Sequence, residues 1–177
     1  MSAITLPLVF GSNNAKGLLD GRYAKAGTKL GCPRVSSLDS RLRPLYTVLG
    51  QRSDPRFERA SALLLTLQES CALERQNLAC LAGEITEMID PDSPLQPGEE
   101  HGERIELTYQ YPLTWSAVKL VKAYDDLMCL IQFLYSTGGL TSNDPLLQAR
   151  KLRQRAGKPV RRFLTQVSKD VASVDFL

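Results

Sequence analysis

The chain has 177 residues, of which 43% are hydrophobic, and a formal net charge of +3 at pH 7. This length allows one substantial domain or two small ones, and the apolar fraction is ordinary for a globular protein with a buried core. The apolar run at residues 4–10 is too short for a signal peptide or a membrane span, and it has no basic leader. We therefore expect a soluble, cytoplasmic protein that makes no membrane contact.

The charged residues are unevenly distributed along the chain. Residues 1–60 carry ten basic and four acidic side chains, residues 84–106 carry one and eight, and residues 141–177 carry eight and three. Two basic ends around an acidic middle suit a protein that binds a polyanion with part of its surface. A solvated mosaic of charges is the alternative interpretation.

The cysteines and the single histidine do not form a recognisable metal site. No two cysteines have the C-x-x-C spacing, and His101 has no partner ligand. We expect no metal and no cofactor, and we expect free thiols in a reducing compartment at Cys32, Cys71, Cys80 and Cys129.

The sequence also predicts no enzyme. One histidine does not make a convincing nucleophile–base set, and no other catalytic pattern stands out. Asp125 and Asp126 are adjacent, so they diverge on a helix and cannot act as a paired acid and base.

The first predicted elements are short. Residues 3–10 indicate an edge strand, because Pro7 has no N–H to give to a central ladder. Residues 11–14 predict a turn and helix cap, and a short helix follows over residues 15–19. Residues 20–37 predict an exposed basic loop, whose glycines do not match a phosphate-binding loop.

A long helix is the clearest element of the first half. Ser53-Asp54-Pro55 offers an N-cap and a proline where helices accept one. Apolar residues then recur every three or four positions to Met88, interrupted only by Glu74. The stripe predicts a helix of about 45 Å, which packs in the core or forms a dimer seam. Residues 90–103 follow as an acidic linker that lacks the glycine and final glutamate of a calcium loop.

Residues 104–111, Arg-Ile-Glu-Leu-Thr-Tyr-Gln-Tyr, are the most informative stretch. Polar and apolar side chains alternate, so a strand here has one polar and one apolar face. Most such strands are half-buried sheet with a wet outer face. The polar face nevertheless carries groups that can read base edges, and the base-contacting candidates are Arg104, Glu106, Thr108 and Gln110.

Two helical patterns follow the strand. The first is capped at Thr114, keeps an apolar stripe through residue 137 and ends at Gly138-Gly139. The second begins within residues 141–145, and a break or kink is expected at Gly157-Lys158-Pro159. Residues 150–162 contain seven cations and no acid, which is unusual for a merely solvated face. The phosphate-contacting candidates are Thr141, Ser142, Asn143, Arg150 and Lys151.

The order strand, helix, loop, helix is that of a ribbon–helix–helix DNA-binding protein. In that class, two chains pair their strands and insert the resulting ribbon into the major groove. The N-terminal strand with Thr5 is the rival candidate for the ribbon, although its alternation is poorer. One departure is the helix over residues 114–137, which is about twice the mean length.

The chain resembles the integrating-conjugative-element protein family, which includes the AcaB-type transcriptional regulators of conjugative plasmids. The resemblance rests on short motifs: Leu6-Pro7-Leu8, Ala15-Lys16, Leu18 to Arg22, Ser53-Asp54-Pro55, Tyr111-Pro112-Leu113, and Ala123 to Met128. It implies a homodimeric regulator of ribbon–helix–helix type that binds promoter DNA and activates conjugative-transfer genes.

We therefore predict a mainly α (α+β), ribbon–helix–helix-like dimer with short strands and additional long helices. Residues 1–103 would supply core or dimer support, and residues 104–177 would form the DNA-binding region. The predicted function is sequence-specific binding of double-stranded promoter DNA in transcription regulation. The alternatives are a helical protein–protein adaptor and a non-specific DNA-binding accessory factor of a transfer complex.

Overall fold

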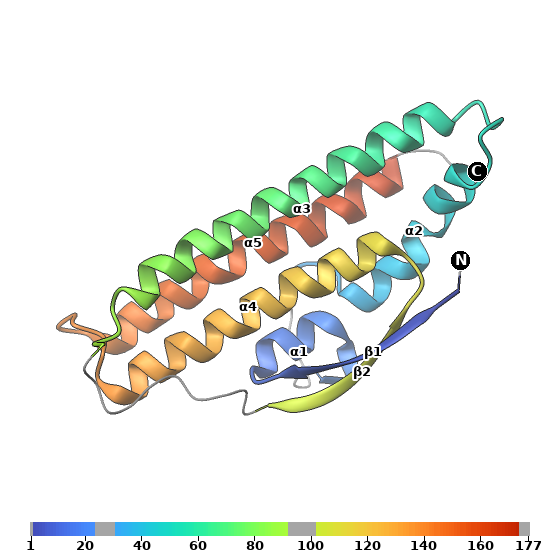
Figure 1. Ribbon diagram of the computed structural model, residues 1–177. Helices are drawn as coiled ribbons and strands as arrows, with labels where there is room; N and C mark the ends of the chain where they lie inside the picture. Colours follow the sequence, from blue (N-terminus) through green and yellow to red (C-terminus); the bar gives the residue numbers. More distant parts are fainter. Residues whose placement is uncertain (1, 24–30, 92–101, 174–177) are drawn as a thin grey trace.

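Three long helices and a two-stranded sheet make up most of the molecule (Figure 1). The computed structural model describes residues 2–23, 31–91 and 102–173. In chain order the elements are β1 (Ile4–Phe10), α1 (Asn13–Leu19), the 3-10 turn η1 (Gly21–Tyr23), α2 (Val35–Leu49), α3 (Phe57–Thr86), β2 (Glu103–Tyr109), α4 (Pro112–Thr137) and α5 (Pro145–Ser173). The predicted mainly helical α+β class is confirmed, including the order strand, helix, helix at the end of the chain.

Some sequence expectations fall partly outside this description. The basic loop expected at residues 20–37 includes residues 24–30, and the acidic linker includes residues 92–101, which are not described. His101 also lies outside the described residues. Within the described ranges, no helix is both long and apolar enough to cross a membrane.

Helices α3, α4 and α5 pack against one another as a bundle, in which α5 runs opposite to the other two (Figure 1). The residues of the apolar stripe predicted for α4 are all buried from Leu113 to Leu134; they are Leu113, Ala117, Leu120, Tyr124, Leu127, Ile131 and Leu134. The stripe predicted for α3 is buried at Ala60, Leu67 and the later positions to Ile85. Both stripes are core, and this core includes residues of both predicted regions.

Glu74, the residue that interrupts the stripe of α3, is itself buried. It is 2% exposed, its Oε1 lies 2.9 Å from Arg162 Nη1 on α5, and Asn77 donates to Oε2. A buried carboxylate needs such partners, because leaving it unpaired would cost several kcal/mol. Glu74, the polar residue within the apolar stripe, therefore connects α3 to α5 through an ion pair.

Of the two outcomes predicted at Gly157-Lys158-Pro159, a break or a kink, the break is wrong, because α5 continues through Pro159 to Ser173. An interior proline costs roughly 3 kcal/mol of helix stability. Val160, Phe163 and Leu164 just beyond it are fully buried, and each such side chain contributes about 1.5–3 kcal/mol. Tertiary packing thus outweighs the local propensity.

Two predicted helix starts also differ from the structure. Helix α3 begins at Phe57 rather than after Ser53, because the Asp54 carboxylate accepts from the backbone N–H and guanidinium of Arg56. These bonds hold the pKa of Asp54 at about 2. Helix α4 begins at Pro112, so Thr114 is a buried residue of the first turn and not the cap. The predicted stop at Gly138 is confirmed, and its φ of 75° favours glycine.

Strands β1 and β2 form an antiparallel ribbon within one chain. The register pairs Thr5 with Thr108, Pro7 with Glu106, and Val9 with Arg104. The ribbon–helix–helix interpretation predicts that residues 104–111 pair with the same residues of a second copy. Instead β1 occupies one edge of β2, so the two rival candidates for the ribbon are partners.

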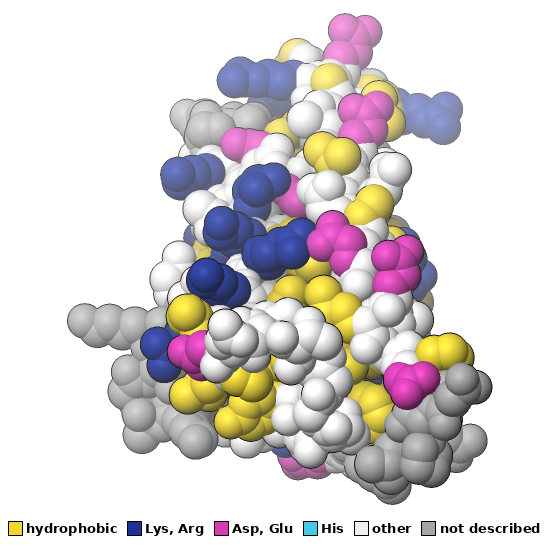
Figure 2. All heavy atoms as spheres, turned by 90° about the vertical axis from the view of Figure 1, so that its left-hand side faces the viewer, with side chains coloured by type: hydrophobic (Ala, Val, Ile, Leu, Met, Phe, Trp, Pro, Cys, Tyr) yellow, Lys and Arg dark blue, Asp and Glu magenta, His cyan; other side chains and the backbone are white. Residues whose placement is uncertain are grey.

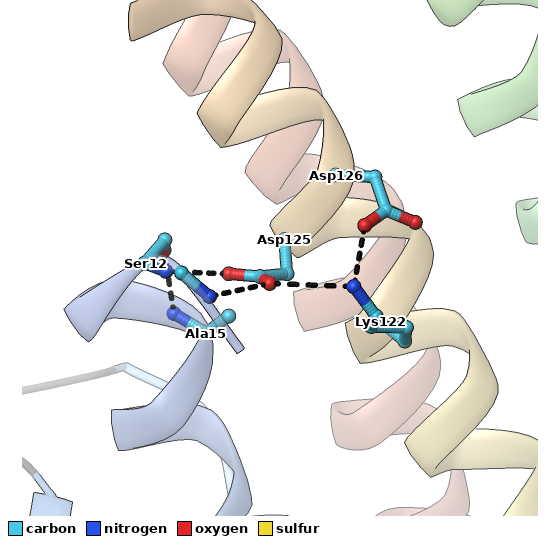
Figure 3. A network of polar contacts seen from close by, with 6 residues as sticks. Ser12, Ala15, Lys122, Asp125 and Asp126 are labelled. Atoms are coloured by element: carbon cyan, nitrogen blue, oxygen red, sulfur yellow. Dashed lines mark hydrogen bonds and ion pairs between the residues drawn. The ribbon is translucent and has the colours of Figure 1, made fainter. Parts of the chain in front are cut away.

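A buried carboxylate on α4 fixes the turn between β1 and α1. Asp125 is 1% exposed and accepts from the backbone N–H of Gly11 at 2.9 Å and of Ser12 at 2.7 Å (Figure 3). Lys122 Nζ lies 3.8 Å from Asp125 and 2.7 Å from Asp126. Ser12 in turn caps α1, as the sequence predicted for this turn. Asp125 therefore sets where the ribbon leaves the helical body.

We predict that Asp125 makes the free energy of unfolding depend on pH. Burial raises the pKa of Asp125 above its ordinary value of 3.8, against the bonds from Gly11 and Ser12 and the charge of Lys122. The folded state then holds the proton to a higher pH than the unfolded chain. The contribution of Asp125 to stability is therefore present below about pH 3.8 and declines as pH rises through its folded pKa.

Denaturant titrations across this pH range would measure the effect. The unfolding free energy of Asp125→Asn, relative to the unmodified protein, should rise with pH. Glu69→Gln, which changes an exposed carboxylate of α3 that forms no ion pair with a described residue, is the control and should keep the original pH profile. Identical profiles for Asp125→Asn and the unmodified protein would contradict the assignment.

Candidate nucleic-acid interface

The outer face of the ribbon is polar, as the alternation predicted. Arg104, Glu106 and Thr108 are exposed, whereas Ile105, Leu107 and Tyr109 between them are buried. The cross-strand register brings Thr5, Pro7 and Val9 of β1 onto the outer face as well. We call these six residues, the exposed three of β2 and their partners on β1, the ribbon outer face. It presents hydrogen-bonding groups to solvent on a rigid two-stranded element.

The candidate base-reading residues differ in how free they are. Arg104 and Glu106 make no ion pair or side-chain hydrogen bond with any described residue. The hydroxyl of Thr108 lies 2.8 Å from that of Thr5, so it can offer only its remaining capacity to a ligand. Gln110 is half-buried and lies just beyond the end of β2. Of the candidate residues, Arg104 is therefore the most accessible to a ligand.

A carboxylate on α2 holds the junction between β2 and α4. Asp39 accepts from the backbone N–H groups of Gln110 and Tyr111 at 3.2 and 3.3 Å, and from the hydroxyl of Thr114 at 2.8 Å. These contacts satisfy donors that neither the strand nor the helix can satisfy. Asp39 therefore fixes the angle at which the ribbon joins the bundle.

Aromatic packing supports the same junction. The rings of Tyr46 on α2 and Tyr111 are stacked, with centroids 4.6 Å apart. Burial raises the pKa of Tyr46, and its hydroxyl accepts from the backbone N–H of Leu113 at 3.3 Å. The rings of Trp115 and Tyr109 pack in a T-shaped arrangement with centroids 5.6 Å apart, and the indole N–H of Trp115 donates to the carbonyl of Tyr109.

A polar hollow of about 540 Å³ lies between the second half of β2 and α2. Its wall on the strand side includes Glu106, Thr108 and Gln110, and its other wall includes Ser40 and Arg43 of α2. Arg43 is exposed and forms no ion pair within the described ranges. The hollow makes α2 a neighbour of the candidate reading residues.

The sequence analysis predicted neither helix α2 nor its contacts with the end of β2 and with the hollow. Helix α2 carries a central Pro44, and the sequence pattern places residues 35–37 in the basic loop. Its buried stripe, Val35, Leu38, Leu42, Leu45 and Val48, is a helical signal that could have identified it. Asp39 itself had no recognisable signal, because its partners are more than seventy positions away.

The predicted phosphate contacts lie elsewhere on the molecule. Thr141, Ser142 and Asn143 are exposed in the loop between α4 and α5, and Arg150 and Lys151 are exposed on α5. Because α4 has 26 residues, this loop is about 39 Å along the helix axis from the end of β2. The structure therefore does not bring the loop and the end of β2 together (Figure 1).

The loop also uses several of its own donors. Asp144 Oδ1 accepts from the N–H of Leu147, which makes Asp144 the N-cap among the offered choices. The N–H of Ser142 donates to Gln148, and the hydroxyl of Ser142 accepts from the N–H of Asp144. Fewer groups therefore remain for a phosphate than the sequence indicated.

These features define a mainly helical protein in which a two-stranded antiparallel ribbon precedes two long packed helices. No protein-family profile matches the chain, and no curated protein sequence matches it. Among solved structures, the fold matches that of AcaB from uropathogenic E. coli, determined as its selenomethionine-containing form. The match has a TM-score of 0.63 and 16% sequence identity, and it covers 95% of this chain and 80% of AcaB. The resemblance inferred from short motifs is thus confirmed at the level of the fold.

We predict that Asp39 is required to hold the ribbon against the bundle. Asp39→Ala would leave two backbone N–H groups and one hydroxyl without their acceptor, which should lower the unfolding free energy by about 2 kcal/mol. Hydrogen exchange of residues 103–111 should accelerate more than that of α5. Ser40→Ala, at the next position of α2, is the control and should change the unfolding free energy by less than about 0.5 kcal/mol. Equal effects of the two substitutions would refute the role of Asp39.

Proposed function

We propose that the protein is a sequence-specific DNA-binding regulator of transcription that reads the major groove with the ribbon outer face. The observation that carries the proposal is the alternating burial of β2, which turns Arg104, Glu106 and Thr108 outward together. A two-stranded ribbon fits the width of the major groove. A guanidinium favours guanine, a carboxamide favours adenine, and a carboxylate can accept from cytosine.

The fold shared with AcaB supports this assignment. By the family resemblance, we extend the proposal to a cytoplasmic homodimer that binds promoter DNA and activates conjugative-transfer genes of a plasmid. The proposed phosphate contacts remain Thr141, Ser142, Asn143, Arg150 and Lys151. Phosphate contacts of this kind would orient the protein, while the ribbon would discriminate between bases.

The proposed dimer contact moves from residues 104–111 to β1. In the described sheet, β1 is hydrogen-bonded along one edge only. Ile4 and Leu6, which are 53% and 45% exposed, are large apolar side chains on that strand. Exposed apolar side chains of this kind mark a contact surface for a second copy, and a contact through them, rather than through the strand edge, leaves the ribbon two-stranded.

The second candidate function is a helical adaptor that binds another protein. One observation favours it: a groove of about 500 Å³ between α3 and α4 is lined mostly by apolar side chains, including Ala72, Ala79 and Leu130. Apolar grooves between helices accept helical segments of partner proteins. The third candidate function is non-specific DNA binding, which requires only that exposed cations such as Arg150 and Lys151 contact the phosphates.

A binding experiment separates the three candidates. The full-length protein would be incubated with a library of duplexes that have a random central segment, and bound duplexes would be recovered by gel shift over several rounds. The regulator should enrich one sequence over the starting pool. An adaptor should retain no duplex. A non-specific factor should retain duplexes without enrichment and with steep salt dependence.

We predict that Arg104→Ala relaxes this sequence preference. The free-energy difference between the selected duplex and a scrambled duplex should fall by about 1–3 kcal/mol, because alanine cannot make a bidentate bond to a base. Fluorescence anisotropy titrations of both duplexes would measure it. Arg59→Ala, which removes an exposed arginine of α3, is the matched control and should leave the preference unchanged. An unchanged preference in Arg104→Ala would remove Arg104 from the reading set.

A further inference from the structure

The seven cations at residues 150–162 fall into two groups, which the sequence could not separate. Arg155 and Arg162 pair with Glu84 and Glu74 of α3, at 2.7 and 2.9 Å. Arg153 donates to Gln132 of α4 at 2.7 Å. These three arginines connect α5 to α3 and α4 through side-chain contacts.

The remaining cations of α5 have no such partner. Each is exposed, and none makes an ion pair or a hydrogen bond with another residue in the described part of the chain. We call this set the α5 cation stripe, and it consists of Arg150, Lys151, Lys158, Arg161 and Lys169.

Helical geometry places the α5 cation stripe on one face. At about 100° per residue, all five positions fall within an arc of roughly 100°, with Arg155 and Arg162 just beyond it on the side of α3. Within residues 144–173 the acids are Asp144 and Asp170. Asp144 precedes the stripe and Asp170 follows it, so no acid lies within the arc between Arg150 and Lys169. From Arg150 to Lys169 the stripe is about 28 Å long, close to the axial rise of eight base pairs.

All five side chains of this face are exposed. Gly157 has no side chain, and a Cβ there would lie 3.4 Å from Nη2 of Arg161, so the guanidinium lies over the glycine. Figure 2 shows a column of basic side chains on one flank of the bundle, and most of the acidic side chains in that view lie on the other flank. In Figure 1, α1 and α4 lie between α5 and the ribbon, so the stripe is a surface separate from the ribbon outer face.

We propose that the α5 cation stripe binds the phosphate backbone of duplex DNA without reading its sequence. The inference rests on the proposed function, because DNA is the polyanion, and it extends the phosphate contacts proposed at Arg150 and Lys151 along α5 to Lys158, Arg161 and Lys169. Exposed cations without acidic neighbours can replace the counterions that surround a duplex, and the release of those counterions drives binding at low salt. The stripe therefore contributes affinity and salt dependence, and the ribbon contributes preference.

The test compares paired and unpaired cations of the same helix. The full-length protein would be titrated, at a series of KCl concentrations, into a fluorescently labelled random-sequence duplex of about 30 base pairs. In K158Q/R161Q, the slope of log Kobs against log[KCl] should become shallower by about 1.8, or about 0.9 for each phosphate that is no longer neutralised. Affinity for every duplex should fall, while the ratio between selected and scrambled duplexes should stay the same.

R155Q is the matched control, since it removes the same charge from the same helix at an arginine that already has a partner. Its slope should equal that of the unmodified protein. An unchanged slope in K158Q/R161Q, or an equal change in R155Q, would overturn the proposal. Thermal unfolding of each variant checks folding, and K158Q alone, with an expected change of about 0.9, replaces the double variant if that variant does not fold.

The same data distinguish failure of the stripe from failure of the proposed function. If the protein selects one sequence and K158Q/R161Q keeps the original slope, the stripe proposal fails and the regulator stands. If the slope changes as expected but no sequence is selected, the stripe stands and specific reading fails.

Discussion

The antiparallel pairing of β1 with β2 joins residues almost one hundred positions apart, and the candidate interface depends on it. In the paired ribbon, Leu107 and Tyr109 are buried on the inner face, and Arg104, Glu106 and Thr108 therefore point outward. Because side chains alternate along a strand, a shift of one residue in how the ribbon sits on the body would reverse this arrangement. Two buried or half-buried carboxylates prevent such a shift. Asp125 holds the end of β1, and Asp39 holds the end of β2.

Both carboxylates act on backbone N–H groups at element ends. Such donors lack partners within their own strand or helix, and a carboxylate accepts from them more strongly than a neutral oxygen does. Neither residue is part of the ribbon, and both belong to helices of the body. The geometry of the ribbon is therefore determined by the body on which it is mounted, which is a suitable arrangement for the DNA-reading surface proposed above.

The cations of α5 divide into those that pair with other residues of the fold and those that are proposed to bind DNA. Arg162 pairs with Glu74 in the core, and Arg155 pairs with Glu84 at the surface, so these cations are already neutralised by the fold. The other exposed cations of α5 are not. This basic run thus contains cations paired within the fold and cations that are exposed and unpaired among the described residues, and only the identity of each neighbour separates them. The acidic residues also fall into two groups, because Glu74 is buried and paired within the fold, whereas Glu106 is exposed to solvent.

Periodicity in the sequence was sufficient to determine the long helices α3 and α4, the first turn and helix, both strands and the polar face of β2. These features follow from local alternation of polar and apolar residues, which the fold preserves wherever an element has one buried face. Helix α2 also has a periodic apolar stripe that indicates a helix, whereas the continuity of α5 through Pro159 and the start of α4 were decided by tertiary structure. In each case, burial of apolar side chains or a carboxylate from a distant segment outweighed a local signal. The sequence likewise could not determine three features that depend on which residues meet in space. These are the pairing of β2 with β1, the hydrogen bonds of Asp39 at the end of β2, and the division of the α5 cations into two groups.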